Sequence, residues 1–187
     1  MRHGLATLAA TLLLASPAWA QGFKCPPAGM VVETDTGGTV SSITYKGADP
    51  ANPMVCVMQT GSGESRRVAN LYGSGSDDAL IAGKMAELIA GKVSETSFTV
   101  TLRATSGKNF TYFDQWSTVG RERLEVAGRQ VDALVLKRRQ NGQSGNSFSG
   151  DFKLWLDPAT GVWLKREATV YSGSQVAPQI VTSIKSP

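Results

Sequence analysis

Apolar and polar residues alternate in short stretches along most of the chain, and clusters of Gly, Asn, Asp, Ser and Pro separate these stretches. Side chains of a β-strand point alternately to its two faces, so this two-residue period predicts strands with one buried face. The separating residues favour tight turns, which predicts that successive strands run antiparallel. Eleven stretches have this pattern, at residues 30–35, 39–45, 54–60, 65–72, 97–105, 110–119, 121–126, 129–139, 147–156, 162–171 and 179–184.

One segment, residues 76–91, instead repeats its apolar residues at helical spacing. Ser76 suits the N-cap, the two aspartates after it suit the positive end of the helix dipole, and Gly91 suits the position just past the last turn. No helix is predicted between most of the other stretches, so we expect a mainly-β protein with a single antiparallel meander rather than a parallel βαβ fold. The helix packs on this sheet or plugs it through an apolar stripe of Leu80, Ile81, Met85, Leu88 and Ile89.

Residues 1–20 have the three parts of a secretory signal peptide: a basic start, an apolar run at residues 5–15, and a small-x-small sequence that ends at Ala20. We therefore expect cleavage near Ala20, a periplasmic or secreted location, and a mature chain of residues 21–187 that forms one β-rich domain. The apolar run is shorter than the ~20 residues that cross a bilayer, and the mature chain has no transmembrane segment. Cys25 does not directly follow the cleavage site, which argues against a lipid-anchored N-terminus.

The charge of the mature chain changes this picture little. Removal of the signal peptide leaves 18 basic and 15 acidic residues, a formal charge near +3, and the only basic run is at residues 137–139. A nucleic-acid site needs a clustered basic patch, so we expect no nucleic-acid partner.

Two cysteines, Cys25 and Cys56, are left after cleavage. In an oxidising compartment an even pair in a small exported domain most often forms a disulfide. Neither a C-x-x-C motif nor a neighbouring base points to a reactive thiol. We therefore predict that Cys25 and Cys56 are bonded to each other.

The only histidine of the chain, His3, lies in the signal peptide, so the mature protein has none. This excludes Ser-His-Asp and Cys-His nucleophile pairs and histidine-ligated zinc. No phosphate-binding loop or serine-nucleophile motif is complete. Glu122 and Glu125 are offset by three residues, which places them on opposite faces of a strand. We expect no enzymatic activity, no cofactor and no metal site.

Residues 150–167, with the sequence GDFKLWLDPATGVWLKRE, predict a hairpin with a purely structural turn at residues 157–161. In the register where Leu156 faces Val162, alternation gives the strands a core face and a second face. The core face holds Phe152, Leu154, Leu156, Val162 and Leu164. The second face holds Lys153, Trp155, Trp163 and Lys165, with Trp155 directly opposite Trp163.

This second face has two interpretations. The tryptophans are covered by a helix, a loop or the stems of the lysines, or they form an aromatic and cationic surface that suits an anionic amphiphile or a sugar ring. The candidate ligand-binding residues are therefore Trp155, Trp163, Lys153 and Lys165.

The C-terminal third contains Gly120-x-Glu122, the Val126-Ala127-Gly128 turn leading to Ala133, Trp155, Asp157-Pro158, Thr160-Gly161 and Lys165-Arg166. Through these features it resembles an exported bacterial family of unknown function whose fold is related to the lipoprotein-localisation carriers. The resemblance implies an incomplete, half-barrel antiparallel sheet whose hollow side is partly filled by helix. The N-terminal half has no motif of that family and the cysteine pair is not one of its features, so a lipoprotein-chaperone activity does not carry over.

The combined features favour a non-catalytic binding or carrier protein for a hydrophobic or amphiphilic, lipid-like ligand. The alternative is a structural or assembly component of the cell envelope that docks another protein. A deep apolar cavity would favour the carrier, whereas a shallow patch or an unpaired edge strand would favour a protein partner.

Overall fold

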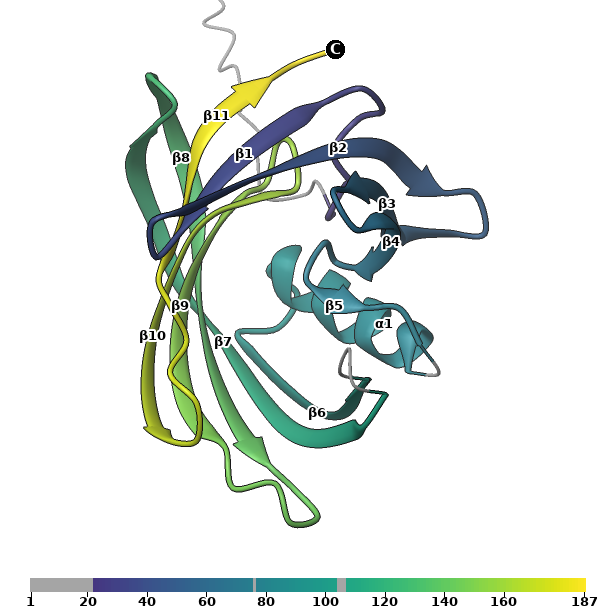
Figure 1. The fold of residues 1–187 in the computed structure, drawn as a ribbon, viewed down its shortest axis with the longest axis vertical. Coiled ribbons are helices and arrows are strands. Elements are labelled where there is room, and N and C mark those ends of the chain that lie inside the picture. Colours follow the sequence, from purple (N-terminus) through teal and green to yellow (C-terminus); the bar gives the residue numbers. More distant parts are fainter. Residues whose placement is uncertain (1–21, 76, 104–106) are drawn as a thin grey trace, which may run out of the picture.

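A computed structural model describes residues 22–75, 77–103 and 107–187 (Figure 1). Within these residues one helix and eleven strands are found. The helix is α1 (Asp78–Ile89), and the strands are β1 (Val31–Thr36), β2 (Thr39–Asp49), β3 (Asn52–Thr60), β4 (Gly63–Val68), β5 (Tyr72–Gly73), β6 (Glu95–Arg103), β7 (Asn109–Val126), β8 (Arg129–Gly142), β9 (Ser149–Asp157), β10 (Val162–Ser172) and β11 (Gln179–Lys185).

The strands of the described chain form one antiparallel sheet in the order β5-β4-β3-β2-β1-β11-β10-β9-β8-β7-β6. Neighbours in the sheet are neighbours in sequence except at β1 and β11, where the first and last strands pair. The sheet curls until its edge strands β5 and β6 approach each other, and α1, which connects them along the chain, lies on the hollow side (Figure 1). The predicted fold class, a mainly-β half-barrel meander with one helix, is confirmed.

Only two residue pairs connect β10 to β11 in the middle of the sheet, Lys165 with Ile180 and Arg166 with Gln179, as few as connect β4 to the edge strand β5. Beyond these pairs β11 is paired only with β1, and β10 is paired only with β9. The barrel therefore has two walls, which we name the N-terminal wall (β1–β5 and β11) and the C-terminal wall (β6–β10).

Two of the predicted strand boundaries are wrong, and both errors have a local cause. The stretches predicted at 110–119 and 121–126 form one continuous strand, β7, whose register against β8 shifts between Thr118 and Gly120. This bulge bends the strand without ending it. The stretch predicted at 65–72 is divided into β4 and β5 by Ala69 and Asn70, which both have positive φ.

Helix α1 ends as predicted, because Gly91 follows it with φ +69°, a conformation that glycine adopts without strain. Ser76, the predicted N-cap, lies outside the described residues. Leu80 is not part of the buried stripe, since 49% of its surface is exposed. The buried side chains of α1 are Ile81, Ala82, Met85, Leu88 and Ile89.

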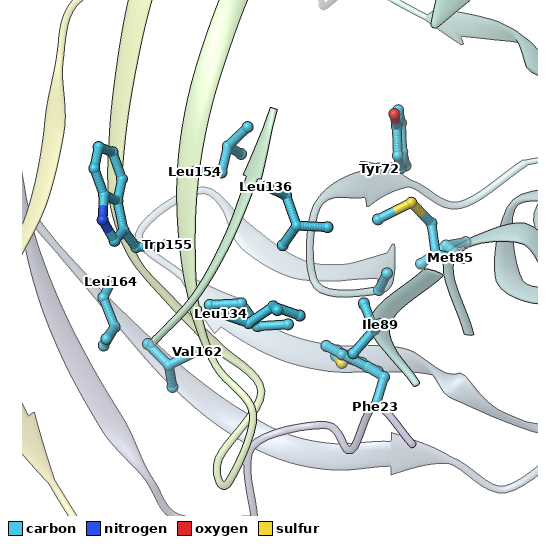
Figure 2. Packing of buried hydrophobic residues seen from close by; sticks show 14 of the residues in the cluster. Phe23, Tyr72, Met85, Ile89, Leu134, Leu136, Leu154, Trp155, Val162 and Leu164 are labelled. Carbon is cyan, nitrogen blue, oxygen red and sulfur yellow. The ribbon is translucent and has the colours of Figure 1, made fainter. Parts of the chain in front are cut away.

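The core lies between this helix and the concave face of the sheet. Figure 2 shows Leu134, Leu136 and Leu154 on the side of the C-terminal wall that faces Met85 and Ile89. All five side chains are buried. The burial of each large apolar side chain contributes roughly 1.5–3 kcal/mol to stability, so this packing is the main stabilising term of the fold.

Cys25 and Cys56 form the predicted disulfide, with their Cα atoms 5.2 Å apart. The bond ties the segment before β1 to the buried side of β3 and occupies the Cys25 thiol, so this thiol is not available for lipid attachment.

The first prediction concerns this bond. Replacing both cysteines by alanine should lower the free energy of unfolding by about 3.5 kcal/mol, because the bond closes a loop of about 31 residues in the unfolded chain. Urea unfolding of the oxidised wild type and the double variant measures the difference. Equal midpoints in the two proteins would show that the bond does not constrain the unfolded state.

The second prediction concerns the two-residue turn between β7 and β8. Ala127 and Gly128 have φ of +51° and +72°, as a type I′ turn requires, and alanine is strained in this region. Ala127→Asn should therefore raise the free energy of unfolding by about 1 kcal/mol in thermal or urea denaturation. Ala159→Asn is the matched control in another turn, where φ is not positive. A similar gain in both variants would contradict the explanation.

Candidate functional site

The hairpin at residues 150–167 has a different register from the predicted one. Asp157 pairs with Val162 and Leu156 with Trp163, and a shift follows between Trp163 and Lys165, so that Trp155 faces Lys165. The turn closes at Asp157, whose backbone carbonyl accepts a hydrogen bond from the amide of Gly161 at 2.8 Å. The prediction that Trp155 and Trp163 form a cross-strand pair on one face is therefore wrong, because a one-residue slip moves a side chain to the other face.

Trp163 lies on the concave side. Its indole N–H donates a hydrogen bond of 2.9 Å to the carbonyl of Ala69, and its ring centroid lies 6.3 Å from that of Trp116. The hydrogen bond connects the C-terminal wall to the positive-φ turn after β4. Trp163 therefore helps to hold the two walls together.

Trp155 points to the opposite, convex side, as Figure 2 shows, and only 1% of its surface is exposed. The ammonium nitrogens of Lys153 and Lys165 lie 4.5 and 4.6 Å from the centroid of its ring. Its indole N–H donates to Glu122 Oε2 at 3.0 Å. The structure thus brings three of the four candidate residues together, and the lysines cover the ring.

Both lysines are also paired with carboxylates, Lys153 with Glu122 at 3.2 Å and Lys165 with Glu167 at 2.6 Å. The hydrogen bond from Trp155, followed by that from Lys153, lowers the pKa of Glu122. These side chains satisfy one another. That the four residues bind a ligand stays a prediction that the structure does not test.

The concave side holds a buried polar network that the sequence analysis did not identify. Asp114 is 0% exposed, and its Oδ2 accepts hydrogen bonds from Tyr72 at 2.6 Å and from two nitrogens of Arg138 at 2.9 and 2.6 Å. Trp116 donates to the hydroxyl of Tyr72 at 2.8 Å. Burial raises the pKa of Tyr72 well above its usual range, so this phenol stays a donor.

The guanidinium of Arg138 has both a carboxylate partner and aromatic partners in this network. In addition to Asp114, its guanidinium lies over the rings of Tyr72, Trp116 and Phe152, at 5.0, 5.6 and 5.4 Å from their centroids. Tyr72 belongs to β5, whereas Asp114 and Arg138 belong to β7 and β8. The network therefore closes the barrel across the seam between its edge strands.

Arg166 is a second arginine on the concave face, because it is paired with Leu154, which is paired in turn with Leu136. Within the described residues its guanidinium donates a hydrogen bond of 3.2 Å to the carbonyl of Ala177, and its buried Nε has no partner there. Burial, followed by the charges of Arg138 and Arg67, lowers the pKa of Arg166.

Arg67 is the third. It pairs with Cys56 in the β3–β4 ladder, and Ser65 on the same face pairs with the buried Met58. In the part of the chain that the structure describes, neither Arg67 nor Arg166 has a carboxylate within salt-bridge distance. The concave face therefore holds three arginines, and of these only Arg138 pairs with a carboxylate, that of Asp114.

Several other buried polar atoms of this face have no hydrogen-bond partner within the described residues. They are Ser65 Oγ, Asp114 Oδ1, Thr118 Oγ1 and Gln140 Nε2. A hollow of about 600 Å³ opens beside Ser65 and Arg67, and its other lining residues are Ser41, Ser42, Ile43, Thr60, Gly61 and Ser62.

A signal for these residues was present in the sequence. Asp114 is two residues from Trp116, and Arg138 is two and four residues from Leu136 and Leu134, so alternation places each charged residue on the same strand face as these apolar residues. A charged residue at a core position of a strand predicts a buried ion pair or a binding group. The signal does not show which charges pair with each other, since the partners are far apart in sequence.

The chemistry available on this face is binding through guanidinium, hydroxyl and amide groups. Among residues 22–75, 77–103 and 107–187, no cluster of three or more His, Cys, Asp or Glu side chains could hold a metal ion. The same residues contain no helix with the length and apolarity needed to span a membrane.

The chain is similar to solved structures of low sequence identity. It superimposes on the hypothetical lipoprotein YmcC from Escherichia coli K12 with a TM-score of 0.55 and 14% identity, over 86% of this chain and 85% of that one. A candidate exported protein with a YmcC-like fold from Bacteroides fragilis has a TM-score of 0.44 and 10% identity, covering 88% of this chain and 99% of its own.

A candidate lipoprotein from Parabacteroides distasonis has a TM-score of 0.45 and 11% identity, covering 89% of this chain and 99% of its own. No family model and no curated protein matches the chain. The relation to the lipoprotein-localisation carriers stays a prediction. At this level of identity, the similarity to YmcC shows that the half-barrel fold is shared.

Proposed function

We propose that this protein is a non-catalytic binding or carrier protein for an amphiphilic, lipid-like ligand outside the cytoplasm. The observation that carries the proposal is the composition of the concave face. Apolar side chains such as Leu136 and Leu154 share this face with polar groups that have no partner within the described chain, including Arg166 Nε and Gln140 Nε2.

The energetics of these groups favour a binding role over a structural one. A buried polar group without a partner costs about 1–3 kcal/mol, so a face built only for stability would replace it by an apolar side chain. An amphiphile offers both an apolar chain and a polar head, and it therefore complements a face that mixes apolar surface with unsatisfied donors.

The location outside the cytoplasm is supported by the signal-peptide pattern of residues 1–20 and by the disulfide between Cys25 and Cys56. The structural neighbours are described as lipoproteins or exported proteins, which agrees with this location. Non-catalytic binding agrees with the absence of histidine from the mature sequence and with the engagement of Asp114 by Arg138 and Tyr72.

The third prediction is that the protein purified from a bacterial periplasm carries a lipid. Native mass spectrometry should show an added mass that organic extraction removes, because the concave face binds the ligand without a covalent bond. Gln140→Leu and Thr118→Val, which replace unsatisfied polar groups by apolar ones, should reduce the lipid-bound fraction without lowering the melting temperature.

A bare mass in every preparation, together with a stoichiometric co-purifying envelope protein, would contradict the carrier and favour the assembly component. Esterase, peptidase, phosphatase and glycosidase substrates should be turned over no faster than in buffer. Turnover that one carboxylate substitution removes from a folded variant would contradict the non-catalytic assignment.

A further inference from the structure

We propose that Arg67 and Arg166 together bind the anionic head group, a carboxylate or a phosphate monoester, of the ligand in the concave side of the barrel. This inference rests on the proposed function and assigns the charge class of the ligand and the two residues that select it. The two arginines belong to different walls, Arg67 to β4 and Arg166 to β10. A head group bound by both would therefore connect the walls.

Arg138 serves for comparison, because its guanidinium is an example on this face whose interactions are provided by the protein itself. It donates two hydrogen bonds to a buried carboxylate and lies over three aromatic rings. Arg166 lies on the same face, yet its single hydrogen-bond acceptor within the described residues is the carbonyl of Ala177. Since a half-buried guanidinium is stabilised by a carboxylate or phosphate, Arg166 is a cation that lacks its complement within the described residues.

The surroundings of Arg67 add donors of the right kind. The hollow beside it is lined by hydroxyl side chains, among them Ser41, Ser42 and Ser65, and the oxygen of Ser65 has no partner within the described chain. Hydroxyl groups donate to anionic oxygens, and guanidinium binds them in a bidentate way. No carboxylate lines this hollow, so nothing there competes with an anion.

The apolar part of the ligand has a surface beside these charges. Ile43 lines the hollow, and Leu154, directly opposite Arg166 in the β9–β10 ladder, is buried on the concave face. A head group between the arginines therefore places the attached chain against apolar side chains. A small inorganic anion would leave this surface without a complement, which favours an amphiphile.

The position of Arg166 also suits a site that takes up a bulky molecule. It forms one of the two residue pairs that connect β10 to β11. A junction with so few ladder hydrogen bonds opens more easily than the longer ladders on either side. Arg166 thus lies where the two walls separate most readily.

The test measures binding of dodecyl phosphate, dodecyl maltoside and inorganic phosphate to the purified mature protein by isothermal titration calorimetry below the micellar concentrations. The variants are Arg67→Gln, Arg166→Gln and the double variant. The matched control is Arg66→Gln, because Arg66 is the neighbour of Arg67 on the same strand but is 56% exposed and pairs with Asp49.

Dodecyl phosphate should bind about 10- to 100-fold more weakly to each single variant, which corresponds to the loss of one charged hydrogen-bonding partner. Binding should be unchanged in Arg66→Gln, and dodecyl maltoside should bind equally to all proteins. The melting temperature of the ligand-free Arg67→Gln and Arg166→Gln variants should equal or exceed that of the wild type, since each removes one of several like charges.

Equal binding of dodecyl phosphate and dodecyl maltoside, unaffected by either arginine variant, would overturn the head-group site and leave the proposed function intact. Binding of neither amphiphile would overturn the proposed function and this inference with it. If inorganic phosphate binds as tightly as dodecyl phosphate, and only when both arginines are present, the result would support the anion site and overturn the proposal that the ligand is an amphiphile. A lowered melting temperature of both arginine variants with unchanged binding would show that the arginines are structural.

Discussion

The concave face of the sheet has to be filled, and the rest of the structure depends on how this is done. A strongly curved sheet turns one face inward, where it cannot reach solvent, and the described chain supplies a single helix to cover it. The helix buries Ile81, Met85 and Leu88 against the sheet. The remaining space is filled by side chains of the strands themselves, many of them large and aromatic, such as Trp116 and Phe152.

A buried carboxylate at the centre of this filling makes the arrangement specific. The ion pair between Asp114 and Arg138 lies in a desolvated environment, where a missing partner would be strongly destabilising. Because Tyr72 of β5 completes the network, the two edge strands of the sheet have to approach each other. Trp163 makes a second polar connection between the walls through Ala69. Arg67 and Arg166 differ from these residues in having no carboxylate partner in the described part of the chain.

The two sides of the C-terminal wall thus have different characters. On the convex side, Lys153, Lys165 and Glu122 satisfy one another around Trp155, so charge and aromatic surface are already in contact. On the concave side, positive charge exceeds negative charge and several polar atoms lack partners within the described residues. Unsatisfied groups are the ones that have free energy to gain from a ligand, which is why we propose that the ligand binds inside the barrel.

Local patterns in the sequence determined the class of fold, most strand positions, the end of α1 at Gly91 and the pairing of Cys25 with Cys56, because each depends on alternation, a turn residue or cysteine parity. They did not determine the faces of Trp155 and Trp163. The turn pairs Val162 with Asp157, one residue away from the predicted register, and this slip places Trp163 on the concave face, while the bulge between Trp163 and Lys165 leaves Lys165 opposite Trp155. On that face Trp163 donates a hydrogen bond to Ala69, 94 residues away, a contact that local alternation does not encode. The charged residues of the concave face were visible at core positions, but only the tertiary structure decided that Asp114 neutralises Arg138 and that Arg67 and Arg166 have no carboxylate partner among the described residues. Ion pairing depends on which strands the closed sheet brings together.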